Sequence, residues 1–195
     1  MLALYFAPGS SSMAVHIALH EIGVPFRARP ISFRKREHRA PDYLALNPEG
    51  KVPTLVIDGR PLTEVAAILY YLAKRFSDAA LLPNDDPEAE AQAISWMSFI
   101  AATLHPARRL GIEHATKVYG IADRRLGRRE WALGRYSIAD IHLFRLYWRL
   151  VNSLKPASGT FPNLSAHYDR MMSRPGAANV RDRKYDRIRI AGMIE

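Results

Sequence analysis

The chain has 195 residues, of which 48% are hydrophobic, and a formal net charge of +9. It contains no cysteine, which excludes a disulfide scaffold, a thiolate-bound metal and any protein thiol acting as nucleophile or redox centre. The positive charge favours anionic partners without choosing among small anions, nucleic acid and acidic membrane surfaces. No signal peptide opens the chain and no apolar run could cross a bilayer, so we expect a soluble, cytoplasmic protein without membrane contact.

The N-terminal part of the chain predicts a strand, a helix and a second strand. The first strand covers residues 2–6, and three serines at 10–12 then precede a helix over residues 13–22 that they can cap. A second strand is expected near residues 26–31, so the two strands are a parallel pair with a right-handed crossover. A short helix over residues 42–46 follows.

The stretch from 47 to 67 has the clearest local signals. A β-branched run begins at Val52 and ends at an Asp-Gly pair, which is a strong hairpin signal. Pro53 cannot donate to a sheet ladder, so the backbone of Val52 is free to pair with an extended ligand. Glu64 then begins a predicted helix, which places a carboxylate beside a helix N-terminus. This stretch therefore predicts two strands and a helix start that can bind a small anionic peptide.

Strand signals end near residue 76. Residues 77–87 are polar and turn-rich, so we expect them to link an N-terminal domain, residues 1–76, to an all-helical domain, residues 88–195. Periodicity predicts helices over residues 88–104, 138–154 and 164–172. Pro106 predicts a kink or break near His105, and Ser137 with Asp140 forms a capping box for the second helix. In the Arg-rich region 107–134 we expect one helix to be truncated.

Five separated segments, in this order, resemble the cytosolic glutathione transferase family, and within it the bacterial beta class. They are residues 4–19, 47–67, 136–141, 161–164 and 174–176. The resemblance covers nearly the whole chain. It implies a thioredoxin-like α/β domain followed by an all-α domain, glutathione as co-substrate without a metal, and a homodimer.

The resemblance assigns control of the glutathione thiol to the serine loop. A free thiol has a pKa of about 8.5, and hydroxyl donors with a helix N-terminus can lower it. Beta-class enzymes have a cysteine at the position of Ser11, whereas other classes use a serine that aligns with Ser10. We assign Ser11 first and Ser10 second as catalytic residues, and Ser12 as a glutathione contact. The alternative is that all three only form the turn and cap the helix.

A serine in place of the beta-class cysteine cannot form a mixed disulfide with glutathione. We therefore expect conjugation or peroxide chemistry without a protein-linked disulfide.

The rest of the glutathione site is also assigned from the resemblance. Glu64 accepts the γ-glutamyl ammonium, and the amides of Glu64 and Val65 hold its carboxylate. The family usually has serine or asparagine at Val65, so we expect weaker binding here. Val52, beside a cis Pro53, pairs with the cysteinyl backbone.

Three basic residues are candidates for the glycyl carboxylate. They are Lys35, Arg36 and Lys51, of which Arg36 aligns best. The alternative is that these basic side chains are only solvated, and that Glu64 only complements the helix dipole.

The acceptor side is assigned to the helical domain. His105 matches a beta-class histidine that approaches the thiol, although a lone histidine on an apolar helix is typically a packed interior residue. Trp96, Phe99 and Ile100 are candidates for an apolar acceptor pocket, but their spacing is equally typical of core residues. The sequence offers no metal site, because the His16 and His20 pair lacks a third ligand.

Three functions compete. The favoured one is a glutathione transferase that acts on a hydrophobic electrophile or a peroxide. The second is a glutathione-dependent reductase or isomerase on the same fold. The third is a non-catalytic, transferase-like protein whose basic surface binds protein or nucleic acid. Nucleic acid is the less favoured partner, since the basic clusters are short and separated.

Overall fold

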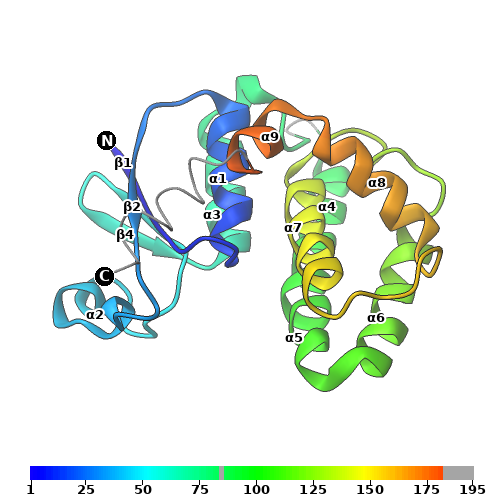
Figure 1. Cartoon of the computed structure of the whole chain (residues 1–195). Helices are drawn as coiled ribbons and strands as arrows, with labels where there is room; N and C mark the ends of the chain where they lie inside the picture. Colours follow the sequence, from blue (N-terminus) through cyan, green and yellow to red (C-terminus); the bar gives the residue numbers. More distant parts are fainter. Residues whose placement is uncertain (84–85, 182–195) are drawn as a thin grey trace. The chain divides into compact units, whose positions relative to one another are not determined.

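The computed structural model describes residues 1–83 and 86–181 (Figure 1). It divides into two compact units, one formed by residues 1–72 with the segment that begins at Pro175, and one formed by residues 73–174. The division falls inside helix α3, and helix α9 (Pro175–Arg181) belongs to the first unit. The last part of the predicted helical domain, residues 182–195, lies outside the described residues.

The first unit is built on a four-stranded sheet with the strand order β2-β1-β3-β4. Strand β1 (Leu2–Phe6) is parallel to β2 (Phe26–Pro30), and helix α1 (Ser12–Ile22) connects them. Strand β3 (Thr54–Ile57) is antiparallel to β1 and to β4 (Arg60–Thr63). This small mixed sheet confirms the predicted thioredoxin-like arrangement.

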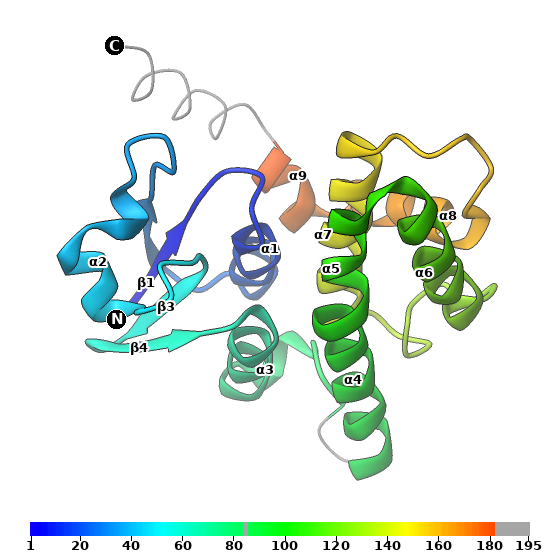
Figure 2. The same ribbon diagram turned by 90° about the horizontal axis from the view of Figure 1, so that it is seen from below.

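Helices α1 and α3 (Val65–Arg75) cover the sheet because both present apolar side chains to it. Residues 12–19 of α1 are all buried, and Ile68, Leu69 and Leu72 of α3 are fully buried. Figure 2 shows α1 and α3 on one side of the strands and α2 (Pro41–Leu46) on the other. Short turns η1 (Glu37–Arg39) and η2 (Ser77–Ala79) complete the first half of the chain.

Helix α9 packs against α1 within the first unit. The backbone N–H of Gly176 donates to a carboxylate oxygen of Glu21 at 3.1 Å. A Cβ at Gly176 would lie 2.6 Å from Oε1 of Glu21, so any other residue there would require the Glu21 side chain to move. The contact joins two segments that are far apart in sequence.

The described part of the second unit, apart from the end of α3, is helical. In chain order its elements are α4 (Pro87–Phe99), η3 (Ile100–Leu104), α5 (His105–Ala107), η4 (Arg108–Leu110), α6 (Gly111–Leu126), α7 (Ile138–Ser153) and α8 (Pro162–Met172). Together with the mixed sheet of the first unit, this confirms the predicted fold class.

The predicted break near His105 takes the form of a π-helical turn, η3. Proline lacks an N–H and its ring crowds the carbonyl four residues earlier, so Pro106 disfavours a regular α-helix there. The chain widens instead, and the N–H of His105 bonds to the carbonyl of Ile100, five residues back.

Region 107–134, in which we expected a truncated helix, contains helix α6, which runs for 16 residues. That this helix is shorter than its counterpart in the family stays a prediction. Its buried residues are Ala115, Val118, Tyr119, Ala122, Asp123 and Leu126, at helical spacing. Exposed charged residues such as Glu113 and Lys117 lie on the opposite face, so α6 is an amphipathic helix with one buried side.

Helix α7 begins with the predicted capping box. The Ser137 hydroxyl accepts from the N–H of Ala139 at 3.3 Å, and the Asp140 carboxylate accepts from the N–H of Ser137 at 2.9 Å. Asp140 also accepts from the N–H of Ala132 at 2.7 Å and lies 3.1 Å from Nε2 of His167. The buried carboxylate therefore fixes both the start of α7 and the loop before it.

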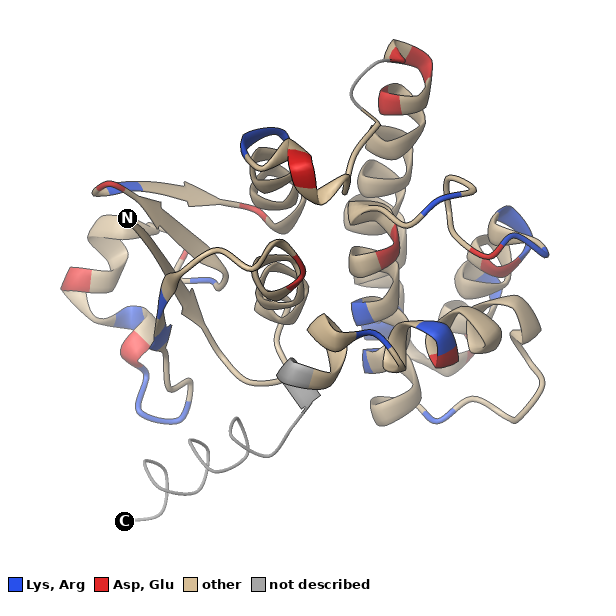
Figure 3. Ribbon diagram, turned by 90° about the horizontal axis from the view of Figure 1, so that it is seen from above, with Lys and Arg blue, Asp and Glu red and all other residues tan. Residues whose placement is uncertain are grey.

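Lysine and arginine are spread over loops and helix ends along the described chain rather than gathered in one tract (Figure 3).

Candidate functional site

Strand register brings the predicted glutathione-binding segments of the first unit to the same edge of the sheet, which is the one where β1, β2 and β4 end and β3 begins. Thr54 pairs with Tyr5 of β1 on one side and with Thr63 of β4 on the other. The serine loop leaves β1 at this edge, the Val52-Pro53 turn enters β3 there, and Glu64 follows β4 there. Strand β2 is parallel to β1, with Pro30 opposite Phe6, so the basic loop after β2 starts at the same edge.

The three serines at the start of α1 have different roles. Ser12 is 1% exposed, and its hydroxyl closes the turn after β1 by accepting from the N–H of Ala7 and donating to its carbonyl, both at 3.2 Å. The Ser10 oxygen lies 2.6 Å from the Ser12 oxygen and accepts from the N–H of Ser12 at 3.3 Å. The hydroxyls of Ser10 and Ser12 therefore bind each other within the turn, and either can be the donor.

Ser11 is the N-cap of α1, yet its hydroxyl caps none of the helix amides. The reason is its helical backbone, with φ −61° and ψ −21°, since a capping side chain needs an extended N-cap residue. Within residues 1–83 and 86–181 the Ser11 side chain makes no hydrogen bond. Its half-buried hydroxyl is thus available to a ligand beside a helix N-terminus.

A buried polar network holds the carbonyl group of Lys51, in the peptide bond that precedes Val52. The Tyr43 hydroxyl donates to the Lys51 carbonyl at 2.5 Å and lies 3.0 Å from the Thr54 hydroxyl. The Asn47 amide donates to the same carbonyl at 2.8 Å and to Thr54 at 3.2 Å. The sequence analysis missed Tyr43 and Asn47, and a turn-forming Asn just before a predicted strand was the available signal.

The turn at Val52 has the geometry that the resemblance implies. The Val52–Pro53 peptide bond is cis. In the described residues the backbone N–H and C=O of Val52 form no backbone hydrogen bond. Gly50, with φ 61°, lets the preceding loop approach closely, since a Cβ there would lie 2.7 Å from the His38 carbonyl. The backbone of Val52 is therefore fixed in place and open to pairing.

Glu64 has a left-handed backbone, with φ 66°. This conformation costs a residue with a Cβ roughly 1–2 kcal/mol, and such outliers concentrate at functional sites. Its carbonyl accepts from the N–H of Ile68 at 2.9 Å, so α3 begins immediately after it. The Glu64 side chain is exposed and Val65 is buried. A free carboxylate thus lies beside the N-terminus of α3.

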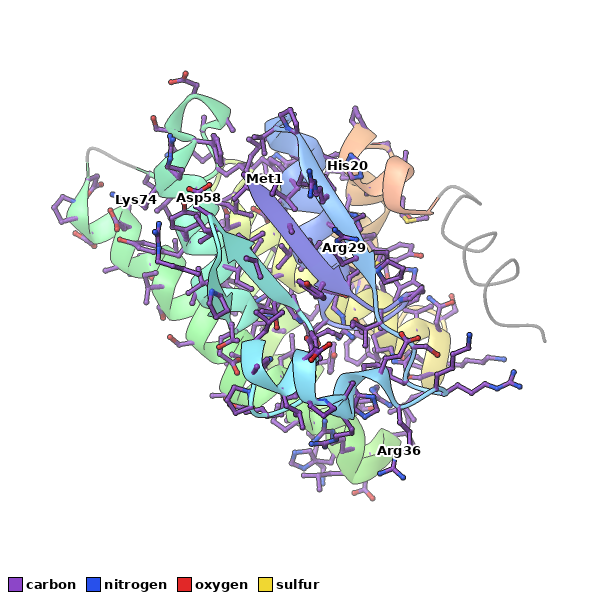
Figure 4. All side chains as sticks on the ribbon, turned by 90° about the vertical axis from the view of Figure 1, so that its left-hand side faces the viewer. Met1, His20, Arg29, Arg36, Asp58 and Lys74 are labelled. Atoms are coloured by element: carbon purple, nitrogen blue, oxygen red, sulfur yellow. The ribbon has the colours of Figure 1, made fainter. Side chains whose placement is uncertain are left out.

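The three basic candidates are exposed. Lys35 and Arg36 lie in the loop after β2, from which Arg36 projects outward (Figure 4). Arg36 has φ 57°, which turns the chain into η1. Lys51 forms an ion pair with Glu49. Their role in carboxylate binding stays a prediction.

The predicted acceptor residues belong to the second unit. Trp96 and Ile100 are buried in its core, and Phe99 packs against that core, as the alternative interpretation of their spacing stated. His105 is half-buried at the start of α5. Burial, then Arg145 and then His105 lower the pKa of the neighbouring His142 to about 3, so His142 is neutral at physiological pH.

The histidine pair of α1 is structural. His16 is 1% exposed and packs edge-on against Phe6 and Phe26, with His20 stacked at 5.6 Å. Burial and then His20 lower the pKa of His16 to about 3. Among residues 1–83 and 86–181 no group of three potential ligands could hold a metal ion, and no described helix is long and apolar enough to span a membrane.

Comparison with known proteins gives a consistent result. Residues 10–75 match the family model "Glutathione S-transferase, N-terminal domain", and residues 110–175 match "Glutathione S-transferase, C-terminal domain". The chain is 32% identical over 193 residues to glutathione S-transferase GstA of Escherichia coli O157:H7, covering 89% of this chain and 94% of that relative. It is 39% identical over 123 residues to a maleylacetoacetate isomerase of Rhizobium meliloti (strain 1021), covering 63% and 56% respectively.

A solved structure of a glutathione transferase homologue from Sulfitobacter, with bound glutathione, has a TM-score of 0.83 at 32% identity. The match covers 95% of this chain and 99% of that one. The chain belongs to the glutathione S-transferase family.

Proposed function

We propose that the protein is a glutathione S-transferase that stabilises the glutathione thiolate for attack on a hydrophobic electrophile or a peroxide. The observation that carries this proposal is the register of Tyr5, Thr54 and Thr63. It gathers a serine hydroxyl, an unpaired stretch of backbone and a carboxylate at one sheet edge, and these groups complement a short anionic peptide with a free amine and a thiol.

The peptide backbone of glutathione binds along Val52. Its cysteinyl N–H and C=O pair with the backbone C=O and N–H of Val52, as in the addition of a strand. Tyr43 and Asn47 hold the adjacent Lys51 carbonyl, so little conformational freedom is lost on binding.

The charged ends of glutathione bind on either side of that turn. Glu64 accepts the γ-glutamyl ammonium, and the first amides of α3 hold the neighbouring carboxylate. Val65 supplies no side-chain donor there, which weakens this contact. The glycyl carboxylate is held by Arg36, with Lys35 and Lys51 as the alternatives.

Ser11 acts on the thiol. Its hydroxyl donates to the sulfur, and the N-terminus of α1 adds partial positive charge, so the thiol pKa falls below its free value of about 8.5. In conjugation the sulfur forms a bond to the electrophilic carbon, the leaving group departs with its electron pair, and the thiol proton goes to solvent. With a peroxide, two glutathione molecules are oxidised to the disulfide while the O–O bond is reduced to an alcohol and water.

The acceptor side and the assembly follow from the family. We propose that His105 donates to the incoming acceptor and that Phe99 contributes to its apolar pocket. We also propose that the protein is a cytoplasmic homodimer, which sedimentation velocity tests.

The isomerase relative supports a second candidate function. Cis–trans isomerisation needs the same thiolate, which adds to a conjugated double bond and then leaves. Glutathione is regenerated in this reaction and consumed in conjugation. Titration of free thiol during turnover of an aryl halide and of a cis-enone diacid therefore separates the two activities.

A thermal-shift titration with glutathione tests the site. Ligand binding to the native state at about 100 times Kd adds about 2.7 kcal/mol of stability, so the wild-type midpoint should rise. Glu64→Gln should lose most of this rise, whereas Glu113→Gln, the same change at an exposed position of α6, should keep it. A flat wild-type titration at millimolar glutathione would refute the proposal and favour a non-catalytic binding protein.

A further inference from the structure

Strand β2 and the loop that follows it form an exposed basic surface in the first unit. Residues 26–39 contain six arginine or lysine residues and one acidic residue, Glu37. The six basic residues, all exposed, are Arg27, Arg29, Arg34, Lys35, Arg36 and Arg39. Among them only Lys35 and Arg36 have a role in the glutathione site proposed above. Figure 4 shows Arg29 on β2 and Arg36 on the loop, both on the side of the first unit that faces the viewer. Arg27, Arg29 and residues 33–36 together are termed the β2 surface.

The strand part of the β2 surface points away from the core of the first unit. Arg27 pairs with Ala3 and Arg29 with Tyr5, and alternate residues of a strand point to opposite faces of the sheet. Both arginines therefore lie on the face opposite to the fully buried Leu4. Among residues 1–83 and 86–181 they make no hydrogen bond or ion pair, so their charge is available to a partner.

The loop part of the β2 surface is held in shape by its own hydrogen bonds, which centre on the buried Ser32. The Glu37 carboxylate accepts from the N–H of Ser32 at 2.7 Å, and the N–H of Glu37 donates to the Ser32 carbonyl at 3.0 Å. The N–H of Lys35 donates to the Ser32 hydroxyl at 3.1 Å. The acidic side chain of the loop is thus bound to the backbone, and residues 33–36 are presented outward without further ordering.

An exposed aromatic ring lies within this basic loop. Phe33 is 47% exposed, and it is the only aromatic residue among the exposed large hydrophobic residues of the described chain. Its ring meets that of His38 edge-on, with the ring centres 4.9 Å apart, so it is supported at the surface. Arginines on β2 by themselves would only keep an open sheet edge from pairing with another chain. A supported, exposed ring followed by three consecutive basic residues indicates a binding surface instead.

We propose that the β2 surface docks on membranes that contain anionic phospholipids, with the Phe33 ring inserted among the headgroups and the basic side chains on the lipid phosphates. Each basic side chain near such a membrane strengthens binding about fivefold, and an apolar ring beside basic residues is typical of interfacial segments. A surface for single-stranded nucleic acid stacks successive bases on several rings, whereas this one offers a single ring. The contact is peripheral and needs no apolar run, so it departs from the expectation of a protein without membrane contact.

Vesicle flotation with the full chain tests the proposal. The vesicles contain phosphatidylcholine alone or with about 30 mol% phosphatidylglycerol, at about 0.15 M ionic strength, where charges beyond roughly 8 Å are screened. We expect the wild type to bind only the anionic vesicles. Arg27→Gln/Arg29→Gln should weaken this binding about 25-fold, since two basic side chains are lost. Phe33→Ser should weaken it at least about fivefold, since the apolar ring is lost.

Arg124→Gln/Arg128→Gln is the matched control, because it removes the same charge from two exposed positions of the second unit. All these variants retain the residues of the proposed glutathione site, so each should keep the thermal shift with glutathione. The proposal is overturned if the wild type binds neutral vesicles equally well or binds neither kind, or if the two double variants bind alike. It is also overturned if Phe33→Ser floats like the wild type; binding of a single-stranded oligonucleotide that depends on Arg27 and Arg29 would then assign the surface to nucleic acid.

Discussion

The network of Tyr43 and Asn47 allows a quantitative test of how the turn at Val52 is held. Tyr43→Phe removes the bond to the Lys51 carbonyl and the contact with the Thr54 hydroxyl, but both oxygens still accept from the Asn47 amide. The variant should therefore lose only the net value of a hydrogen bond, about 1 kcal/mol of unfolding free energy. Burial raises the pKa of Tyr43, so its hydroxyl remains a donor at neutral pH.

Asn47→Ala is the matched single variant. It removes the two amide bonds and also the bond from the Glu49 N–H to the Asn47 side chain, at 3.1 Å. Its cost should be about 1–2 kcal/mol, because Tyr43 still satisfies the Lys51 carbonyl.

The double variant leaves the fully buried Thr54 hydroxyl without Tyr43 and without Asn47. An unsatisfied buried polar group costs about 1–3 kcal/mol, so the double variant should lose at least about 1 kcal/mol more than the sum of the single variants. Urea denaturation of the four proteins measures this coupling, and glutathione affinity should fall in the same order. Additive losses within about 0.5 kcal/mol, or unchanged affinity in the double variant, would show that the network does not hold the site.

Three further predictions follow from the same structure. Ser11→Ala should raise the thiol pKa of bound glutathione, measured by thiolate absorbance against pH, and leave the melting midpoint unchanged. Ser12→Ala should instead lower the melting midpoint. The reverse pattern would contradict the assignment of Ser11 to the thiol and Ser12 to the turn. Glu64→Gly should weaken glutathione binding yet raise stability by up to about 1 kcal/mol through relief of the left-handed strain, while Glu64→Ala should weaken binding without that gain. His16 and His142 have a pKa of about 3 in the folded state against 6.5 otherwise, so only the unfolded chain binds protons on them between these values. The contribution of these histidines to the free energy of unfolding should be complete above pH 6.5, and it should fall on acidification by up to about 1.4 kcal/mol per pH unit for each histidine. If urea denaturation of His142→Gln gave the same dependence of unfolding free energy on pH as the wild type, this would be contradicted.

Local signals in the sequence were sufficient for most secondary structure. The Asp-Gly turn, the Ser137–Asp140 capping box and the break at Pro106 each depend on the preferences of a few neighbouring residues, and the structure contains all three. Helix α6 is the exception. Its buried apolar residues, from Ala115 to Leu126, have helical spacing, but the interpretation of this Arg-rich region did not use that pattern.

The sequence by itself indicated the fold class, through the order of its strand and helix signals. The resemblance of its motifs indicated the family and implied which segments form the proposed glutathione site. Only the tertiary structure decided how the site residues differ from one another. Ser11 is the serine with a free hydroxyl because Ser10 and Ser12 bind each other and Ala7, and Glu64 is held in a left-handed conformation between β4 and α3. Hydrogen-bond partners and burial depend on contacts between residues distant in the chain, and no local pattern records which of three adjacent hydroxyls those contacts leave free.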